Sequence, residues 1–240
     1  MSAYYNEIDP HAAAWLRELI KHGHIADGVV DERSIEDVEP AELLGFTQCH
    51  FFAGIGGWSY ALRLAGWPDD KPVWTGSCPC QPFSAAGKQR GSDDARHLWP
   101  AFFHIIRECR PGTVFGEQIA GGAGYAWWDH VAADMEGEGY AAAAADLPAS
   151  CIGAIHQRHR IFWVGSNTDS HGYKGGINKP IALCAPWGQE QFARLVQESV
   201  RLSRPSGKAG LLDDGLSRSL AGFGNAIVPQ IAAAFVRAAA

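Results

Sequence analysis

The sequence predicts an α/β protein built on a doubly wound, mostly parallel sheet. Two observations support this prediction. Segments typical of strands alternate with segments typical of helices as far as residue 165, and the glycine-rich turn Phe52–Gly57 stands between a strand and a helix. The chain has 240 residues, of which 47% are hydrophobic, and this is enough to fill the core of one large domain.

The expected elements follow one another in a regular alternation. Strands are predicted where β-branched and aromatic residues gather, at 3–9, 27–35, 72–81, 112–118 and 161–165, and at 47–57, where a strand runs into the glycine-rich turn. Helices are predicted where apolar residues recur at helical spacing, at 10–23, 39–46, 58–66, 97–110, 125–139, near 189–203 and at 225–240. Alanine runs such as 141–145 favour a helix by composition alone.

After Gly165 the alternation stops in a stretch rich in Gly, Asn and Ser. We therefore expect one main domain, formed by residues 1–165 and 216–240, with an insert at 166–215. The whole chain has a net charge of −6, but between residues 152 and 208 eight Lys or Arg stand against three Asp or Glu. A basic segment of this kind can contact phosphates, and a solvated basic loop would explain it equally well.

Neither a membrane span nor a secretory signal is expected from the sequence. No run of about 18 apolar residues occurs, and the N-terminus lacks a basic segment followed by a long apolar one. The six cysteines include no C-x-x-C pair, and the chain is large for a disulfide scaffold. We therefore expect a reduced, cytoplasmic protein.

The segment 76–85, GSCPCQPFSA, contains two cysteines one residue apart. A zinc site needs about four ligands at workable spacing, and the other cysteines stand singly along the chain. A disulfide between Cys78 and Cys80 would close a very small ring. A nucleophile fits better, because Pro79 and Pro82 fix the backbone on either side of Cys80. We interpret Cys78 as a small buried residue.

The turn FAGIGG is typical of sites where a ligand approaches helix N–H groups, although such turns also occur without a ligand. A nucleotide-type cofactor would also need an acid at the end of the next strand, and the sequence after the turn has no place for one. Glu7 and Asp9 end the first predicted strand, and Asp31 lies in the second. Glu7, Asp9 and Asp31 could be ordinary surface acids. If they bind the cofactor instead, the strands follow one another along the chain in a circularly permuted order, in which the second and third strands of the sheet come before the first.

Five motifs in order, FFAGIGGW, CPCQPFSAAGKQRG, GEQIA, HQRHRIFWVG and GFGNAIVPQIA, lie between residues 50 and 240. They resemble the cofactor loop, the proline–cysteine loop, the glutamate strand, the arginine strand and the final helix of DNA (cytosine-5) methyltransferases. The N-terminal 45 residues resemble the acidic cofactor motifs of that family moved to the front. The resemblance covers nearly the whole chain, and short phage and prophage members are the most similar.

This resemblance implies a Rossmann-like, S-adenosylmethionine-dependent methyltransferase sheet in permuted order, and four catalytic residues. Cys80 would add to C6 of a cytosine that has left the duplex. Glu117 would contact N3 and the exocyclic amine, so that the ring accepts electrons, and Arg158 and Arg160 would support the base, the glutamate and the loop. A strand-end ion pair for Glu117 and edge-strand charges for the arginines are the structural alternatives.

The resemblance also implies contacts to S-adenosyl-L-methionine from residues spread along the chain. The methionine end would lie against the glycine loop, the ribose against Glu7 and the adenine amine against Asp31. Cys78 and Pro79 would lie near the sulfonium, and the start of the last helix would close the pocket. The full set of expected cofactor-binding residues is Phe52, Gly54, Ile55, Gly56, Glu7, Ile8, Asp31, Cys78, Pro79, Asn225 and Ala226.

Three departures from the family pattern concern the site. Gln118 replaces an Asn that usually orders the catalytic loop, Ile155-His156 replaces a Pro-Gln pair, and His50 stands where an acid often begins the cofactor loop. The insert at 166–215 would be a short target-recognition region, with few side chains to read base edges, so we expect a short or relaxed recognition sequence.

We expect a monomer that acts on double-stranded DNA without a metal or a membrane. A catalytically inactive DNA-binding homologue and an RNA cytosine-5 methyltransferase remain as alternatives. Amino-methylating DNA enzymes usually have an Asp/Asn-Pro-Pro-aromatic loop, and the matching strand of this chain is followed by none.

Overall fold

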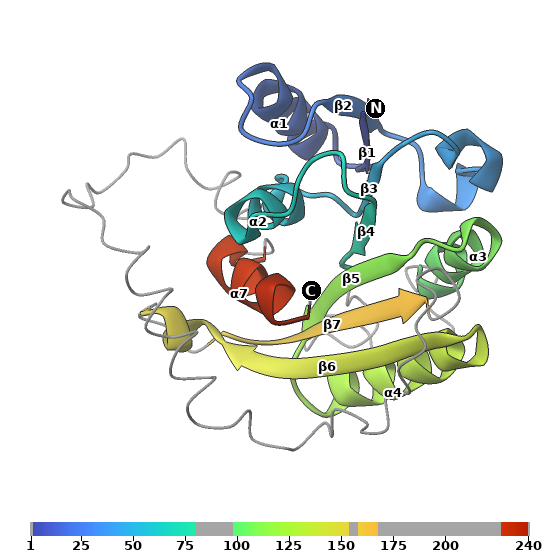
Figure 1. Ribbon diagram of the computed structural model, residues 1–240, viewed down its shortest axis with the longest axis vertical. Coiled ribbons are helices and arrows are strands. Elements are labelled where there is room, and N and C mark those ends of the chain that lie inside the picture. The colour runs from blue at the N-terminus through green and yellow to red at the C-terminus, as the bar shows by residue number, and fades with distance from the viewer. Residues whose placement is uncertain (1, 80–97, 154–157, 168–226, 240) are drawn as a thin grey trace.

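A computed structural model of the chain describes residues 2–79, 98–153, 158–167 and 227–239 (Figure 1). Seven strands within these ranges form one sheet: β1 (Ala3–Asn6), β2 (Gly28–Asp31), β3 (Gln48–Phe51), β4 (Val73–Gly76), β5 (Thr113–Ile119), β6 (Tyr140–Pro148) and β7 (His159–Asn167). The described α-helices are α1 (Pro10–Lys21), α2 (Gly57–Ala65), α3 (Trp99–Cys109), α4 (Gly122–Gly137) and α7 (Pro229–Ala239). Short 3₁₀ turns are η1 (Ile35–Asp37), η2 (Pro40–Leu43) and η5 (Ala149–Ile152).

The order of the strands in the sheet is β2-β1-β3-β4-β5-β7-β6. The first five strands in this order pair in parallel, and β7 is antiparallel to both of its neighbours. If β3, the strand before the glycine turn, is counted first, then β1 and β2 are the second and third strands and the order becomes the 3-2-1-4-5 of doubly wound sheets. The permuted order predicted from the sequence is therefore confirmed.

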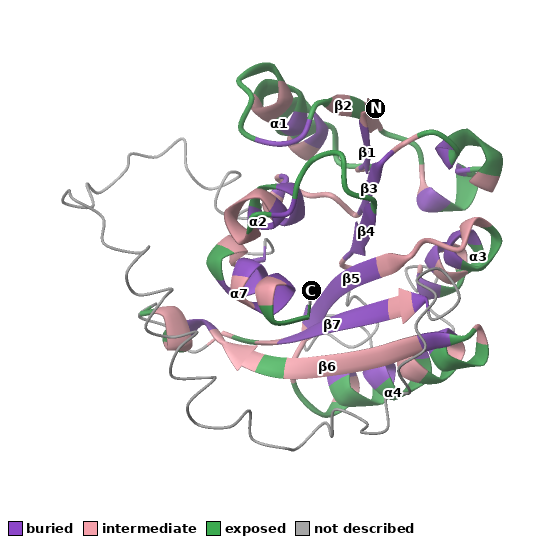
Figure 2. Cartoon of the chain, viewed as in Figure 1, coloured by how far each residue is buried: buried purple, intermediate pink, exposed green. Residues whose placement is uncertain are grey.

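Helices cover both faces of the sheet (Figure 1). One face is covered by α1, α2 and α7, and the other by α3, α4 and the η1–η2 segment. The inner strands β1, β3, β4, β5 and β7 are largely buried, the edge strands β2 and β6 are mostly half-buried, and the outer sides of the helices are exposed (Figure 2). On the α3 side the core contains Phe51, Phe102 and Trp163, and on the α7 side it contains Phe115 and Phe162.

The ends of the helices follow from local sequence. Asp9 caps α1 by accepting hydrogen bonds from the N–H groups of His11 and Ala12, and Pro10 stands at the first helical position. Gly66 ends α2 in the left-handed conformation. Among the described residues the last helix begins at Pro229, and Ile227 and Val228, which were predicted to be helical, precede it, because proline fits a first turn and breaks an interior one. None of the helices described is long and apolar enough to cross a membrane.

The alanine run at 141–145 forms part of the edge strand β6, although its composition favours a helix. This strand pairs with β7 along its whole length, from Tyr140 opposite Asn167 to Pro148 opposite His159. Its alanines pack partly against the core clusters on both faces of the sheet. Pairing and packing therefore outweigh the helix propensity of alanine, which amounts to a few tenths of a kcal/mol per residue.

Candidate active site

The predicted site residues come from strands whose carboxyl ends lie side by side. Phe51 at the end of β3 pairs with Asn6 of β1 and with Gly76 of β4, and Gly76 in turn pairs with Gly116 of β5. The helix that follows β3 covers one face of the sheet and the helix that follows β4 covers the other (Figure 1). The point between β3 and β4 is therefore the switch point, where open α/β sheets bind their ligands.

The glycine turn after β3 has a backbone shaped for close approach. Phe52, Gly54 and Gly56 all have positive φ angles, of 52°, 54° and 81°, and for Phe52 this conformation is strained. No side chain among the described residues caps the N–H groups at the start of α2, and a Cβ at Gly54 would meet open space. Uncapped N–H groups beside open space favour an anionic or strongly polar ligand.

Glu7 reaches this turn from the neighbouring strand. Its Oε2 accepts a 2.7 Å hydrogen bond from the Gly54 N–H, and its Oε1 accepts one of 2.9 Å from the Asp9 N–H. Each carboxylate oxygen keeps a further acceptor position, which a ribose hydroxyl can use. Ile8, the next residue, is 65% exposed and can contact an apolar ring. The acid, the exposed apolar side chain and the open turn together fit a nucleoside cofactor.

Asp31 at the end of β2 already has several donors. Its carboxylate accepts hydrogen bonds from the Tyr4 hydroxyl (2.8 Å), the Arg33 backbone N–H (2.9 Å) and the Arg33 guanidinium (2.7 Å). Partial burial by itself would raise the pKa of Asp31, but the bonds from Arg33 and Tyr4 outweigh burial and lower it. An adenine amine would therefore have to share this carboxylate with Arg33.

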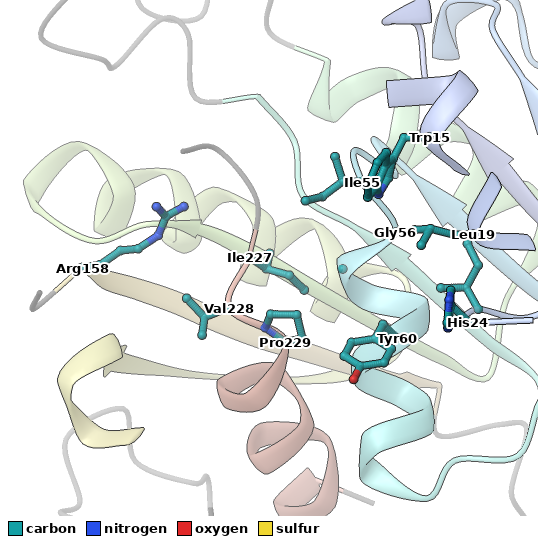
Figure 3. A pocket seen from close by; sticks show the side chains of 12 residues that line it. Trp15, Leu19, His24, Ile55, Gly56, Tyr60, Arg158, Ile227, Val228 and Pro229 are labelled. Atoms are coloured by element: carbon teal, nitrogen blue, oxygen red, sulfur yellow. The ribbon is translucent and has the colours of Figure 1, made fainter. Parts of the chain in front are cut away.

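A cavity of about 470 Å³ lies where the glycine turn meets the last helix (Figure 3). Ile227 and Val228 stand in its middle, Arg158 lies at one end, and Trp15 and Leu19 of α1 lie at the other. The remaining lining residues are His24, Ile25, Ile55, Gly56, Gly57, Tyr60 and Pro229. The structure thus brings Ile55 and Gly56 of the turn, Arg158 and the start of the last helix around one cavity, whose size lies within the range of small-molecule sites.

Glu117 and the two arginines form a buried charged group on the α7 side of the sheet. Glu117 is 7% exposed, and its Oε1 lies 2.8 Å from the Nε of Arg160, which is on the neighbouring strand β7. Burial raises the pKa of Glu117 to about 7, although Arg160 and Arg158 act to lower it. Burial and the charge of Arg160 lower the pKa of Arg158, whose φ of 34° is again unusual for a residue other than glycine. A carboxyl group with a pKa near 7 can donate or accept a proton at neutral pH.

The segment that leads to the predicted nucleophile is held from two sides. The Trp58 indole N–H donates to the Ser77 hydroxyl at 2.9 Å, and the Gln118 side-chain amide donates to the Cys78 carbonyl at 3.4 Å. Gln118, which stands where the family usually has an Asn, therefore contacts the described residues that lead to Cys80. Cys80 itself lies outside the described residues, as do Asn225 and Ala226.

Cys78 has the properties of a structural residue. It is 5% exposed, and burial raises the pKa of its thiol well above the ordinary value, so the thiol stays protonated. Pro79 beside it is exposed. His50 is also buried, donates or accepts a 2.8 Å hydrogen bond with Thr75 and stacks on Tyr5. Burial lowers the pKa of His50 to about 3, so a neutral ring takes the place of the acid expected there.

Sequence reasoning gave no role to Trp58, although it lies at the centre of these contacts. An aromatic residue directly after the double glycine was the signal available in the sequence. Its indole N–H could be given a partner only when the fold had placed Ser77 beside it.

Comparisons with known proteins place this chain in a family. The model of the family described as C-5 cytosine-specific DNA methylase matches residues 67–199. The type II methyltransferase M.NaeI of Lentzea aerocolonigenes is 29% identical over 163 residues, which are 66% of this chain and 32% of that protein. The type II methyltransferase M.NgoMIV of Neisseria gonorrhoeae is 40% identical over 53 residues, 22% of this chain and 17% of that protein.

Among solved structures, a mutant of Spodoptera frugiperda DNMT2 matches 68% of this chain and 42% of its own, with a TM-score of 0.45 and 14% identity. The matched part of this chain spans a third or less of the length of the two curated relatives.

Proposed function

Since the chain belongs to the C-5 cytosine-specific DNA methylase family, we propose that it transfers a methyl group from S-adenosyl-L-methionine to C5 of a flipped cytosine in DNA. The observation that supports this most directly is the buried Glu117 with Arg160 at 2.8 Å and a pKa of about 7. A carboxyl group that can be protonated at neutral pH is what activation of a cytosine at N3 requires.

The proposed chemistry begins with the Cys80 thiolate, which adds to C6 of the cytosine. Glu117 donates a hydrogen bond or its proton at N3, so that the ring accepts the electron pair of the thiolate. Arg158 and Arg160 hold Glu117 and the base in place. The electron pair then returns through C5, which takes the methyl group. Loss of the C5 proton and departure of the Cys80 sulfur restore the aromatic ring and release the enzyme.

S-adenosyl-L-methionine supplies an electrophilic methyl group when bound. Its binding residues are proposed from the resemblance to the family: the glycine loop with Phe52, Gly54, Ile55 and Gly56, Glu7 for the ribose, and Ile8 for the adenine. Asp31, Cys78, Pro79, Asn225 and Ala226 complete the proposed set. The open glycine turn, the uncapped start of α2 and the free acceptor positions of Glu7 support this assignment.

The same proposal divides the chain by function. Residues 1–165 and 216–240 would form the catalytic domain, and residues 166–215 would be a short target-recognition region. We further propose that the protein acts as a cytoplasmic monomer on double-stranded DNA. The excess of basic over acidic residues between 152 and 208 supports contact with phosphates.

The test is covalent trapping on duplex DNA that contains 5-fluorocytosine, because the fluorine at C5 prevents the final elimination. The full chain with S-adenosyl-L-methionine should form an adduct that survives denaturing gel electrophoresis. Cys80→Ser should form none, and Cys151→Ser, a substitution of a half-buried cysteine in η5, should behave as wild type. Bisulfite sequencing of a methylated plasmid would identify the product and the target sequence. If the protein binds cofactor and DNA but forms no adduct and methylates no DNA, the proposal is contradicted. If it methylates RNA and not DNA, the substrate is RNA.

A further inference from the structure

Trp58 connects the glycine turn to the other three segments of the proposed site. It is the second residue of α2, directly after the turn, and only 5% of it is exposed. Its indole N–H donates a 2.9 Å hydrogen bond to the Ser77 hydroxyl. Its ring lies stacked on Phe115, with centroids 6.1 Å apart, and edge-on to Phe162, also at 6.1 Å.

Each of these three partners lies within three residues of a proposed catalytic residue along the chain. Ser77 precedes Cys80 by three residues. Phe115 is two residues before Glu117 on the same face of β5, and Phe162 pairs with Glu117 across the strands. Phe162 is also two residues after Arg160 on β7. One side chain therefore contacts the segments that hold the nucleophile, the glutamate and the arginine.

The start of α2 has little freedom to move without moving Trp58. A Cβ on Gly57 would lie 2.8 Å from the Ile227 side chain, so the first turn of the helix is packed closely against the start of the last helix. Close-packed interiors transmit small displacements instead of absorbing them. A change of conformation in the glycine turn should therefore displace the Trp58 indole, and the indole should displace Ser77 through their hydrogen bond.

We infer that Trp58 is a positioning residue, which couples cofactor binding at the glycine turn to the placement of residues 77–79, the described segment that leads to Cys80, through its hydrogen bond to Ser77. This inference rests on the proposed function. A phenylalanine at this position would keep the ring contacts with Phe115 and Phe162 but would leave the Ser77 hydroxyl without its indole donor. The function of the indole N–H can thus be separated from that of the ring.

The experiment compares Trp58→Phe, Ser77→Ala and the double variant. Each single change should slow adduct formation on 5-fluorocytosine DNA by about threefold to tenfold, the range for one neutral hydrogen bond. The affinity for S-adenosyl-L-methionine, measured by calorimetry, should change less than twofold. The double variant should be no slower than the slower single variant, because both changes remove the same bond.

A second readout follows the coupling itself. In wild type, bound cofactor should change the rate at which iodoacetamide alkylates Cys80, as measured by mass spectrometry of the Cys80 peptide. In Trp58→Phe and Ser77→Ala this effect of cofactor should largely disappear. A loss of buried packing alone would not remove it, so this readout distinguishes a positioning role from a structural one.

Trp67→Phe is the matched control. Trp67 is 7% exposed, lies edge-on to the same Phe115 at 5.8 Å, and donates its indole N–H to the Lys71 carbonyl at 3.1 Å. Its replacement removes one indole hydrogen bond from the same cluster and leaves the bond to Ser77 intact, so adduct formation should keep the wild-type rate.

Equal slowing by Trp67→Phe and Trp58→Phe, or additive slowing by Trp58→Phe and Ser77→Ala, would overturn the inference. If wild type forms no adduct, the proposed function fails, and the effect of cofactor on Cys80 alkylation still decides the coupling. If cofactor still changes the rate of Cys80 alkylation in both single variants, this result overturns the inference by itself.

Discussion

The buried carboxyl group of Glu117 should make folding stability fall as pH rises, and Glu117→Gln should remove that dependence. Burial raises the pKa of Glu117 to about 7 from an ordinary value of 4.5, although Arg160 and Arg158 act to lower it. Between these two values the folded protein keeps a proton that the unfolded chain has released. The contribution of Glu117 to stability is therefore fully present below pH 4.5 and is lost as the pH rises through 7.

The size of the effect follows from these two pKa values. Ionisation of Glu117 costs ~0.8 kcal/mol of folding free energy at pH 5 and ~3.3 kcal/mol at pH 8. The stability of Glu117→Gln relative to wild type should therefore increase by ~2.5 kcal/mol from pH 5 to pH 8. Groups that titrate independently of Glu117 cancel in this comparison, and arginines stay charged throughout the range.

Urea unfolding followed by tryptophan fluorescence, at pH 5, 6, 7 and 8, measures the free energies of unfolding of both proteins. Arg160→Gln provides a second test, since loss of the cation 2.8 Å away should raise the pKa of Glu117 by a further ~1–3. In that background the advantage of Glu117→Gln should continue to grow above pH 8 instead of levelling off. If the difference in the free energy of unfolding between wild type and Glu117→Gln stays constant from pH 5 to pH 8, the reasoning is refuted.

Three further predictions concern the site and its support. Cys80→Ser should abolish transfer of tritiated methyl to DNA but spare cofactor binding in calorimetry, and Cys78→Ser should keep most of the activity; equal losses would contradict this division. Glu7→Gln should weaken S-adenosyl-L-methionine binding by about 10- to 150-fold, since hydrogen bonds to charged groups contribute ~1.5–3 kcal/mol, and an unchanged Kd would exclude the ribose contact. Gly116→Ala should destabilise the fold by ~1–3 kcal/mol in urea unfolding, because its Cβ would lie 2.2 Å from the Trp163 ring, and wild-type stability would show that the ring moves freely.

Most of the sheet could be predicted because its strands are short runs of buried residues bounded by turn-forming ones. The parallel strands β1 to β4 lie within predicted segments, and β5 extends one residue beyond its own, to Ile119. Their order could be predicted as well, because a dinucleotide-type site needs an acid beside its glycine turn, and Glu7 was available only upstream. The 2.7 Å hydrogen bond from the Gly54 N–H to Glu7 agrees with that reasoning.

The edge strand β6 could not be predicted, because its sequence contains no strand signal. Five alanines fit a helix better than a strand when they are considered without their neighbours. What makes them a strand is pairing with β7, and β7 is recognised by its own residues Ile161–Gly165. The residues that determine this strand therefore lie in β7, and a prediction from residues 141–145 and their sequence neighbours cannot use them.

The motifs predict residue types for the candidate site, but they do not predict the electrostatics of these residues. The motifs identified Glu117 and the arginines, whereas the pKa of about 7 depends on burial that no motif reports. The contact of Gln118 with the Cys78 carbonyl was unexpected for a related reason. The Gln118 amide reaches the Cys78 carbonyl because β4 and β5 pair with Gly76 opposite Gly116, and the sequence alone does not give this register.

The permuted chain needs a connection that an unpermuted sheet of this kind lacks, since residues 32–47 must return from β2 past β1 to β3. This connection is fixed by the same residues that border the proposed adenine site. Arg33 bridges Asp31 at 2.7 Å and Glu42 of η2 at 2.9 Å, while Ile35 and Leu43 are buried against the core on the α3 side. Asp31 is thus anchored to the connection at the edge where the adenine would bind. If Asp31 binds the adenine amine as proposed, the same carboxylate would hold both the connection and the ligand, and Arg33→Ala should change both the stability of the connection and the affinity for the cofactor.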